Sequence, residues 1–69
     1  MNFITIELDE QTMRVPAGSN LADLLGLLDL APASMATARN GQFVRREARA
    51  HTRLDDGDRV LLFKPIVGG

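Results

Sequence analysis

Apolar and polar positions alternate near the start of the chain. Within residues 3–8, Ile4, Ile6 and Leu8 fall on one face and polar side chains fall between them, as in a half-buried strand. Three polar residues follow, and residues 12–15 return as a second short strand. The pattern therefore predicts an N-terminal hairpin.

A helical pattern comes next. Four leucines follow the i, i+3, i+4, i+7 spacing of one helical face, namely Leu21, Leu24, Leu25 and Leu28. Asn20 is a good N-cap, and Asp23 lies near the positive start of the helix dipole. Because Pro32 lies beyond the apolar stripe, the sequence predicts a helix over residues 21–29 that packs its leucines into the core.

The second half of the chain predicts three more strands. In order, the elements are a strand over 35–39, an Asn40-Gly41 turn, a strand over 42–45, a loop with a short helical turn over 46–53, a turn at 55–58 and a strand over 59–64. Asn-Gly is a strong signal for a two-residue hairpin, because both central positions of that turn need positive φ.

One helix among five short strands predicts an α+β fold. A single helix can cover only one face of one small sheet, so we expect a β-grasp arrangement with a mixed sheet of four to five strands. The first and last strands should lie parallel in the middle, with the helix in the crossover between the strand pairs. We assign residues 1–65 to this domain.

The last strand is apolar on both faces. Alternation places Val60 and Leu62 on one face and Leu61 and Phe63 on the other. With helix on only one side of the sheet, one pair should face outward and mark a partner site, unless the loop after residue 46 folds over it.

Size and composition favour a binding or carrier role. A chain of 69 residues makes one domain, whose core supplies about 3–5 kcal/mol, so a deep catalytic pocket is not expected. The net charge of −1 gives no general attraction for nucleic acid or membranes. There is no cysteine, no signal-peptide pattern at the start and no apolar run of spanning length, so we expect a cytoplasmic protein.

No residue pattern indicates a metal site or a catalytic site. The acidic turn at 55–58 lacks the ligand spacing of a calcium loop, and His51 is the single histidine. We therefore expect no metal, no bound cofactor and no enzymatic activity. Five arginines form either a solvated edge or a surface that docks on an acidic partner: Arg39, Arg45, Arg46, Arg49 and Arg53.

The sequence finishes with Gly68-Gly69 after an apolar run. Two residues without Cβ atoms can pass through a channel too narrow for other residues, and their carboxylate can be activated by another enzyme. Pro65 cannot donate to a sheet ladder, so pairing should stop near it. We expect residues 66–69 to form a flexible arm that spans about 13–14 Å when extended.

Several short motifs together resemble the thiamine-biosynthesis sulfur carriers, a family of small ubiquitin-like proteins. They are Pro16-Ala17-Gly18, Asn40-Gly41, Val44 followed by Arg46, Leu54-x-x-Gly57-Asp58 and Phe63-x-x-x-x-Gly68-Gly69. The resemblance covers essentially the whole chain. It implies that an E1-like adenylyltransferase uses ATP to adenylate the Gly69 carboxylate, which then becomes a thiocarboxylate.

The resemblance also implies partners. Sulfur would come ultimately from a cysteine desulfurase, and thiazole synthase would take it to build the thiazole ring. The residues expected at partner surfaces are Leu61, Phe63, Pro65, Val67 and Arg46. Three alternatives stay open: the small subunit of molybdopterin synthase, a carrier for another sulfur-transfer pathway, and a non-covalent β-grasp interaction domain.

Overall fold

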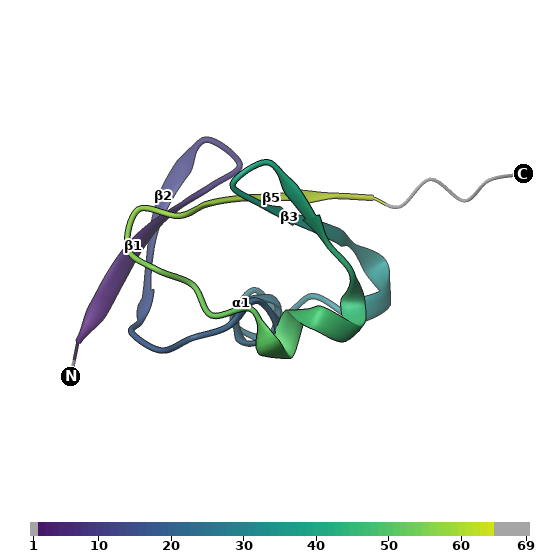
Figure 1. The fold of residues 1–69 in the computed structure, drawn as a ribbon, viewed down its shortest axis with the longest axis horizontal. Coiled ribbons are helices and arrows are strands. Elements are labelled where there is room, and N and C mark those ends of the chain that lie inside the picture. Colours follow the sequence, from purple (N-terminus) through teal and green to yellow (C-terminus); the bar gives the residue numbers. More distant parts are fainter. Residues whose placement is uncertain (1, 65–69) are drawn as a thin grey trace, which may run out of the picture.

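A single mixed sheet organises the molecule, and its helical segments all lie below it in Figure 1. The computed structural model describes residues 2–64. In chain order the elements are β1 (Phe3–Leu8), β2 (Gln11–Pro16), α1 (Leu21–Leu27), η1 (Pro32–Ser34), β3 (Ala36–Arg39), β4 (Gln42–Val44), η2 (Arg46–His51) and β5 (Arg59–Phe63), where η marks a 3₁₀ helix. The boundary predicted at residue 65 lies outside the described residues.

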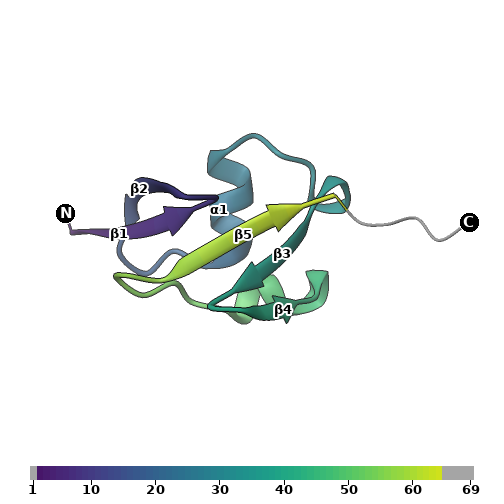
Figure 2. The same ribbon diagram turned by 90° about the horizontal axis from the view of Figure 1, so that it is seen from above.

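The strand order places the last strand in the centre of the sheet. The order is β2-β1-β5-β3-β4, with β1 and β5 parallel and the other neighbouring pairs antiparallel. Figure 2 shows β5 crossing the middle of the sheet, with α1 behind it. The predicted β-grasp order is therefore confirmed, including the parallel central pair.

Helix α1 begins where the sequence predicts. Asn20 accepts a hydrogen bond from the Asp23 amide at 2.7 Å, and the Asp23 carboxylate accepts one from the Asn20 amide at 3.1 Å. This reciprocal capping box satisfies two amides that the first turn leaves free. The helix ends at Leu27, two residues earlier than predicted, because Leu28 caps it and Asp29 takes a positive φ of 58°.

The core lies between α1 and the sheet. Its most buried members are all at most 2% exposed, namely Ile6, Val15, Leu21, Leu24, Leu54 and Val60. Leu25 is also buried and Leu28 packs against this cluster, so the predicted leucine stripe is confirmed as core.

The β3–β4 hairpin follows the predicted turn. Asn40 and Gly41 both have positive φ, at 51° and 86°, and Arg39 lies opposite Gln42 across the turn. Both strands are one residue shorter than predicted.

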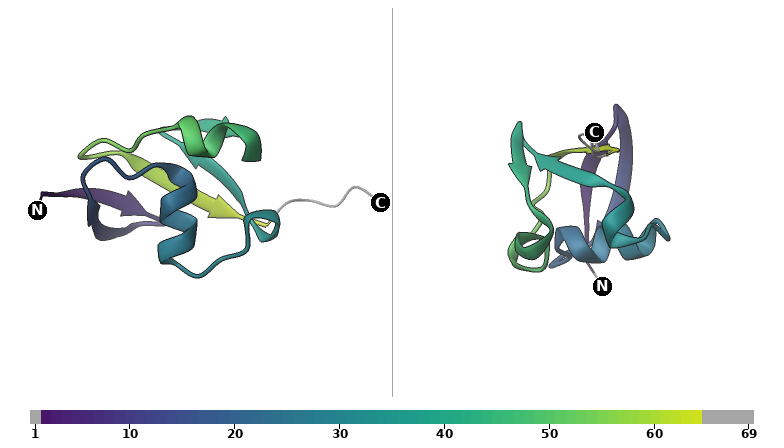
Figure 3. Two further views of the ribbon diagram at one scale, coloured as in Figure 1. Left: turned by 90° about the horizontal axis from the view of Figure 1, so that it is seen from below. Right: turned by 90° about the vertical axis from the view of Figure 1, so that its right-hand side faces the viewer.

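Segment η2 is held beside the start of α1. The Asn20 side chain donates to the Ala50 carbonyl at 3.2 Å, and the Leu21 amide donates to the Thr52 carbonyl at 3.0 Å. Figure 3 (left) shows α1 and η2 in front of the sheet when the molecule is seen from below. Within residues 2–64, no helix covers the other face of the sheet.

Candidate functional site

The uncovered face of the sheet carries a group of three exposed apolar side chains on β5 and β4. On β5, Leu61 is 42% and Phe63 is 44% exposed, whereas Val60 on the opposite face is fully buried. Ala38 pairs with Leu61 on one side and with Phe43 on the other, so all three share this face. Phe43 is 66% exposed. We name Phe43, Leu61 and Phe63 the outer apolar patch.

The predicted orientation of β5 is therefore confirmed, and the alternative in which the loop after residue 46 covers this face is wrong. That loop forms η2, which contacts α1 on the opposite side of the sheet. Two exposed phenylalanines and a leucine on so small a protein are typical of a partner-binding surface.

Phe43 is a member of the patch that the sequence interpretation missed. The signal was available, because an Asn40-Gly41 turn places Arg39 opposite Gln42 and therefore Ala38 opposite Phe43. The pairing of Ala38 with Leu61 could not be obtained in this way, since no tight turn joins β3 to β5.

The other half of the outer face is mainly polar, with Phe3 as its one large exposed apolar side chain among the described residues. Arg59 and Glu7 lie opposite each other on β5 and β1 and form an exposed ion pair at 3.1 Å. The guanidinium of Arg14 on the edge strand β2 lies 5.2 Å from the centre of the Phe3 ring on the neighbouring strand β1. The apolar patch is thus limited to the half of the sheet formed by β5, β3 and β4.

The structure separates the predicted partner residues. Leu61 and Phe63 lie together, but Arg46 is at the start of η2, in the helical layer. A shallow hollow at the edge of the molecule is lined by Phe43, Arg45 and Arg46 among others, so Arg46 reaches the rim of the patch but is not part of it. The predicted site residues Pro65, Val67, Gly68 and Gly69 lie outside the described residues.

Arg49 corrects the interpretation of the five arginines as one solvated or docking surface. It is only 4% exposed, and its guanidinium donates to the carbonyls of Pro32 at 2.8 Å and Met35 at 2.5 Å and to the Thr37 hydroxyl at 3.3 Å. Burial, and then the nearby charge of Arg46, lower the pKa of Arg49. Arg49 therefore joins η2 to η1 and β3.

Arg39 is also engaged within the fold, through the acidic turn before β5. Buried Asp58 accepts hydrogen bonds from Arg39 Nε at 2.7 Å, Asn40 Nδ2 at 3.0 Å and the Asp55 amide at 2.8 Å. Burial alone would raise the pKa of Asp58, but these bonds and the Arg39 charge outweigh it, so the pKa lies below its ordinary value. The turn at 55–58 thus links the start of β5 to the end of β3 through hydrogen bonds.

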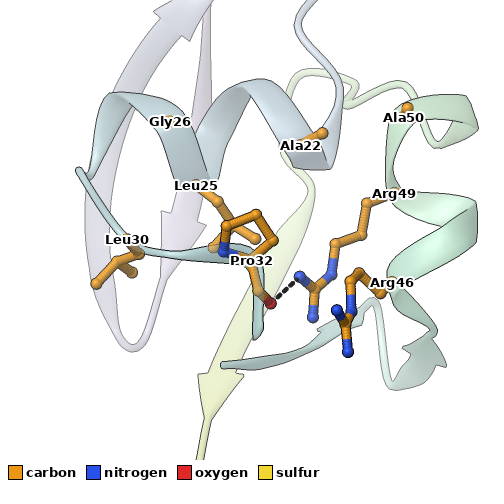
Figure 4. Close-up of a pocket in the computed structure, with 8 residues that line it drawn as sticks. All are labelled: Ala22, Leu25, Gly26, Leu30, Pro32, Arg46, Arg49 and Ala50. Atoms are coloured by element: carbon orange, nitrogen blue, oxygen red, sulfur yellow. Dashed lines mark hydrogen bonds between the residues drawn. The ribbon is translucent and has the colours of Figure 1, made fainter. Parts of the chain in front are cut away.

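A second hollow lies in the helical layer, between α1 and η2 (Figure 4). Its volume is about 350 Å³, and Leu25, Leu30 and Pro32 form much of its apolar wall. Arg46 and Arg49 enter it side by side from η2. We name it the helical hollow.

The described part of the chain contains no cluster of His, Cys, Asp and Glu side chains that could hold a metal ion. His51 is exposed at the end of η2. Across residues 2–64, no helix is both long enough and apolar enough to cross a membrane. The described residues therefore provide two candidate binding surfaces, an exposed apolar patch on the sheet and an arginine-lined hollow in the helical layer.

These features define a small β-grasp protein with an exposed apolar sheet face, and comparison with known proteins identifies its family. The model of the ThiS family matches residues 2–69, so this chain belongs to the ThiS family. It is 43% identical over 61 residues to the sulfur carrier protein ThiS of Escherichia coli K12, covering 88% of this chain and 92% of that protein.

Solved structures agree with this assignment. The crystal structure of the thiamine biosynthesis protein ThiS from Geobacter metallireducens is similar with a TM-score of 0.83 and 28% identity, over 96% of this chain and 100% of that one. An NMR structure of a thiamine biosynthesis protein from the same organism gives 0.73 and 26% identity, over 96% and 88% of the two chains. The fold is therefore the ubiquitin-like β-grasp of the ThiS proteins.

Proposed function

We propose that this chain is a sulfur carrier for thiamine biosynthesis and that the carboxylate of Gly69 holds the sulfur. The observation that carries the proposal is the match to the ThiS family over residues 2–69, a segment that includes Gly68 and Gly69. The relatives' names, a sulfur carrier and thiamine biosynthesis proteins, favour thiamine over molybdopterin as the pathway served.

The chemistry is acyl activation followed by sulfur transfer. An E1-like adenylyltransferase joins the Gly69 carboxylate to the α-phosphate of ATP and releases pyrophosphate. A protein persulfide, whose sulfur comes ultimately from a cysteine desulfurase, then attacks the acyl carbon and displaces AMP. A thiol reduces the resulting acyl disulfide, which forms a new disulfide and releases the thiocarboxylate. Thiazole synthase receives this sulfur. The chain supplies the acyl group and the enzymes supply the catalysis, so the chain itself is not an enzyme.

The outer apolar patch is the surface that docks on the activating enzyme in this proposal. Two of its three residues, Leu61 and Phe63, lie on β5, the last described strand before the terminal glycines, so docking there brings the following segment close to the partner. Burying large apolar side chains such as Leu61 and Phe63 supplies binding free energy without any charge pairing.

The test is enzymatic conversion of the terminus. Incubation with an E1-like adenylyltransferase, ATP and sulfide should replace one C-terminal oxygen by sulfur, and fragment mass spectrometry should confine the change to Gly69. A variant that lacks Gly69 should not be converted, and Gly68→Val should block adenylation because a branched side chain cannot enter a glycine-sized channel. If the Gly69 deletion still supports thiazole formation, the non-covalent interaction domain becomes the better account.

A further inference from the structure

The helical hollow combines an apolar wall with two arginines that form no ion pair with any residue of the described range 2–64. Arg46 and Arg49 both line it, and within residues 2–64 neither is close enough to a carboxylate to form an ion pair. By contrast, Arg39 and Arg59 are both paired with carboxylates. The hollow therefore holds two guanidinium groups that form no ion pair within residues 2–64, and the nearby charge of Glu47 offsets only part of the repulsion that Arg49 experiences.

Arg49 is held in place before any ligand arrives. A guanidinium has five N–H donors, and three hydrogen bonds to Pro32, Met35 and Thr37 fix this one. Among the described residues, two of its donors have no acceptor, in a side chain that is almost fully buried. Because the guanidinium is already immobilised, a ligand that binds it loses little further side-chain entropy.

Arg46 supplies the exposed part of the same site. It is exposed and lies beside Arg49 in the hollow (Figure 4), and its charge is felt by Arg49, since it is one of the causes that lower the pKa of that residue. An anion placed between the two guanidinium groups would relieve this repulsion and could accept bonds from both.

The apolar wall of the hollow indicates which kind of anion would fit there. Leu25, Leu30 and Pro32 leave an apolar surface next to the two guanidinium groups, and the volume of about 350 Å³ is in the lower part of the range of small-ligand sites. Inorganic phosphate would leave this apolar surface exposed to water. A carboxylate on a short apolar body would cover it and place its charge on the arginines.

We propose that the helical hollow is a binding site for a carboxylate carried on a small apolar body. The site lies in the layer opposite the outer apolar patch, so it can be occupied while the sheet face is docked on an enzyme. It does not depend on the proposed sulfur chemistry. The carboxylate can belong to a free small acid or to an acidic side chain of a partner protein, and the two sources differ in the size of body that must fit.

The experiment is a ¹H–¹⁵N NMR titration of the full chain with hexanoate. We expect saturable shifts at the Gly26 and Ala50 amides and at Arg49 Nε–H, with little change at Leu61. Hexanamide has the same apolar body without the charge, and we expect it to bind at least tenfold more weakly. Equal affinity for the two compounds would overturn the proposal.

Variants distinguish binding at this site from nonspecific electrostatic attraction. Arg46→Gln should weaken hexanoate binding at least fivefold, whereas the matched control Arg45→Gln, an exposed arginine outside the hollow, should change it less than twofold. Gly26→Leu should also prevent binding, because a Cβ at Gly26 meets no atom within 4 Å and the added side chain would occupy the hollow. Equal losses in the two arginine variants would refute a specific site.

A competition experiment identifies the source of the carboxylate. A capped Leu-Glu-Leu peptide that displaces hexanoate at lower concentration would indicate an acidic side chain of a partner protein. Hexanoate binding without displacement by the peptide would indicate a free small acid. No specific shift with either probe would overturn the site, and because no enzyme or sulfur is present, that result would leave the proposed sulfur-carrier function untouched.

Discussion

Replacing Asp58 by asparagine should remove a large part of the stability of this domain. In the folded protein one Asp58 oxygen accepts from Arg39 Nε and the Asp55 amide, and the other accepts from Asn40 Nδ2. Asparagine keeps only one acceptor oxygen, so its amide group must face either the donors of Arg39 and Asp55 or that of Asn40. Asn40 cannot rotate to adapt without giving up its own bond from the Arg59 amide at 2.9 Å.

The magnitude follows from these contacts. Hydrogen bonds to a charged group contribute about 1.5–3 kcal/mol, and the variant loses both the charge and at least one bond. A domain of this length has a total unfolding free energy of about 3–10 kcal/mol. We therefore expect Asp58→Asn to lower the unfolding free energy by about 2 kcal/mol, and the urea midpoint by about 2 M at a slope near 1 kcal/mol per M. Circular dichroism is the assay, because the chain has no tryptophan or tyrosine.

Asp55→Asn is the matched control. Asp55 contacts the same arginine at 3.2 Å, but its side chain is 71% exposed, so the loss should be below about 1 kcal/mol. Because the folded-state pKa of Asp58 is lowered, its contribution is complete above the ordinary aspartate value of about 3.9 and disappears as the pH falls through the lower folded value. The gap between wild type and Asp58→Asn should therefore narrow below about pH 4. Equal losses in both variants, or a gap independent of pH, would refute this account.

Three further changes test the patch and the helix. Leu61→Asp should keep the fold and weaken binding to the activating enzyme about thirtyfold, which corresponds to about 2 kcal/mol. The control Val60→Asp should instead unfold the domain, because Val60 is fully buried. Calorimetric titration measures the binding and circular dichroism measures the folding, and normal binding by Leu61→Asp would exclude the patch as the docking site. Asn20→Ala removes both the cap and the bond to Ala50 and should lower the unfolding free energy by about 1 kcal/mol in urea, so an unchanged midpoint would contradict the capping role. Gly26→Ala should raise it by about 0.5–1 kcal/mol, since the added methyl group meets no atom within 4 Å; a loss of stability would mean that the position needs glycine.

The features that the sequence predicted well depend on local rules. The Asn20 cap, the leucine stripe and the Asn40-Gly41 turn are each set by residues a few positions apart, and all three are confirmed. The parallel central pair could also be predicted, because topology restricts how one helix can connect two hairpins.

The features that the sequence did not predict depend on contacts between distant segments. Nothing near Arg49 distinguishes it from the exposed arginines around it, since its acceptors come from η1 and β3, which are 12 to 17 residues away. The full extent of the outer apolar patch likewise depends on the register between β3 and β5, which no tight turn determines. The helical hollow depends on the same packing, because η2 must lie beside α1 for it to exist.

The central position of β5 has a mechanical consequence for a protein that presents its terminal segment to other enzymes. A pull on the chain beyond residue 64 acts along β5, which is hydrogen-bonded to β1 on one side and to β3 on the other. Because ladder hydrogen bonds lie across the strand direction, such a load shears both ladders at once and cannot peel them open one bond at a time. An edge strand in the same role would have only one ladder to resist the pull. The β-grasp order thus places the strand that takes the load at the centre of the sheet, where two ladders resist its extraction.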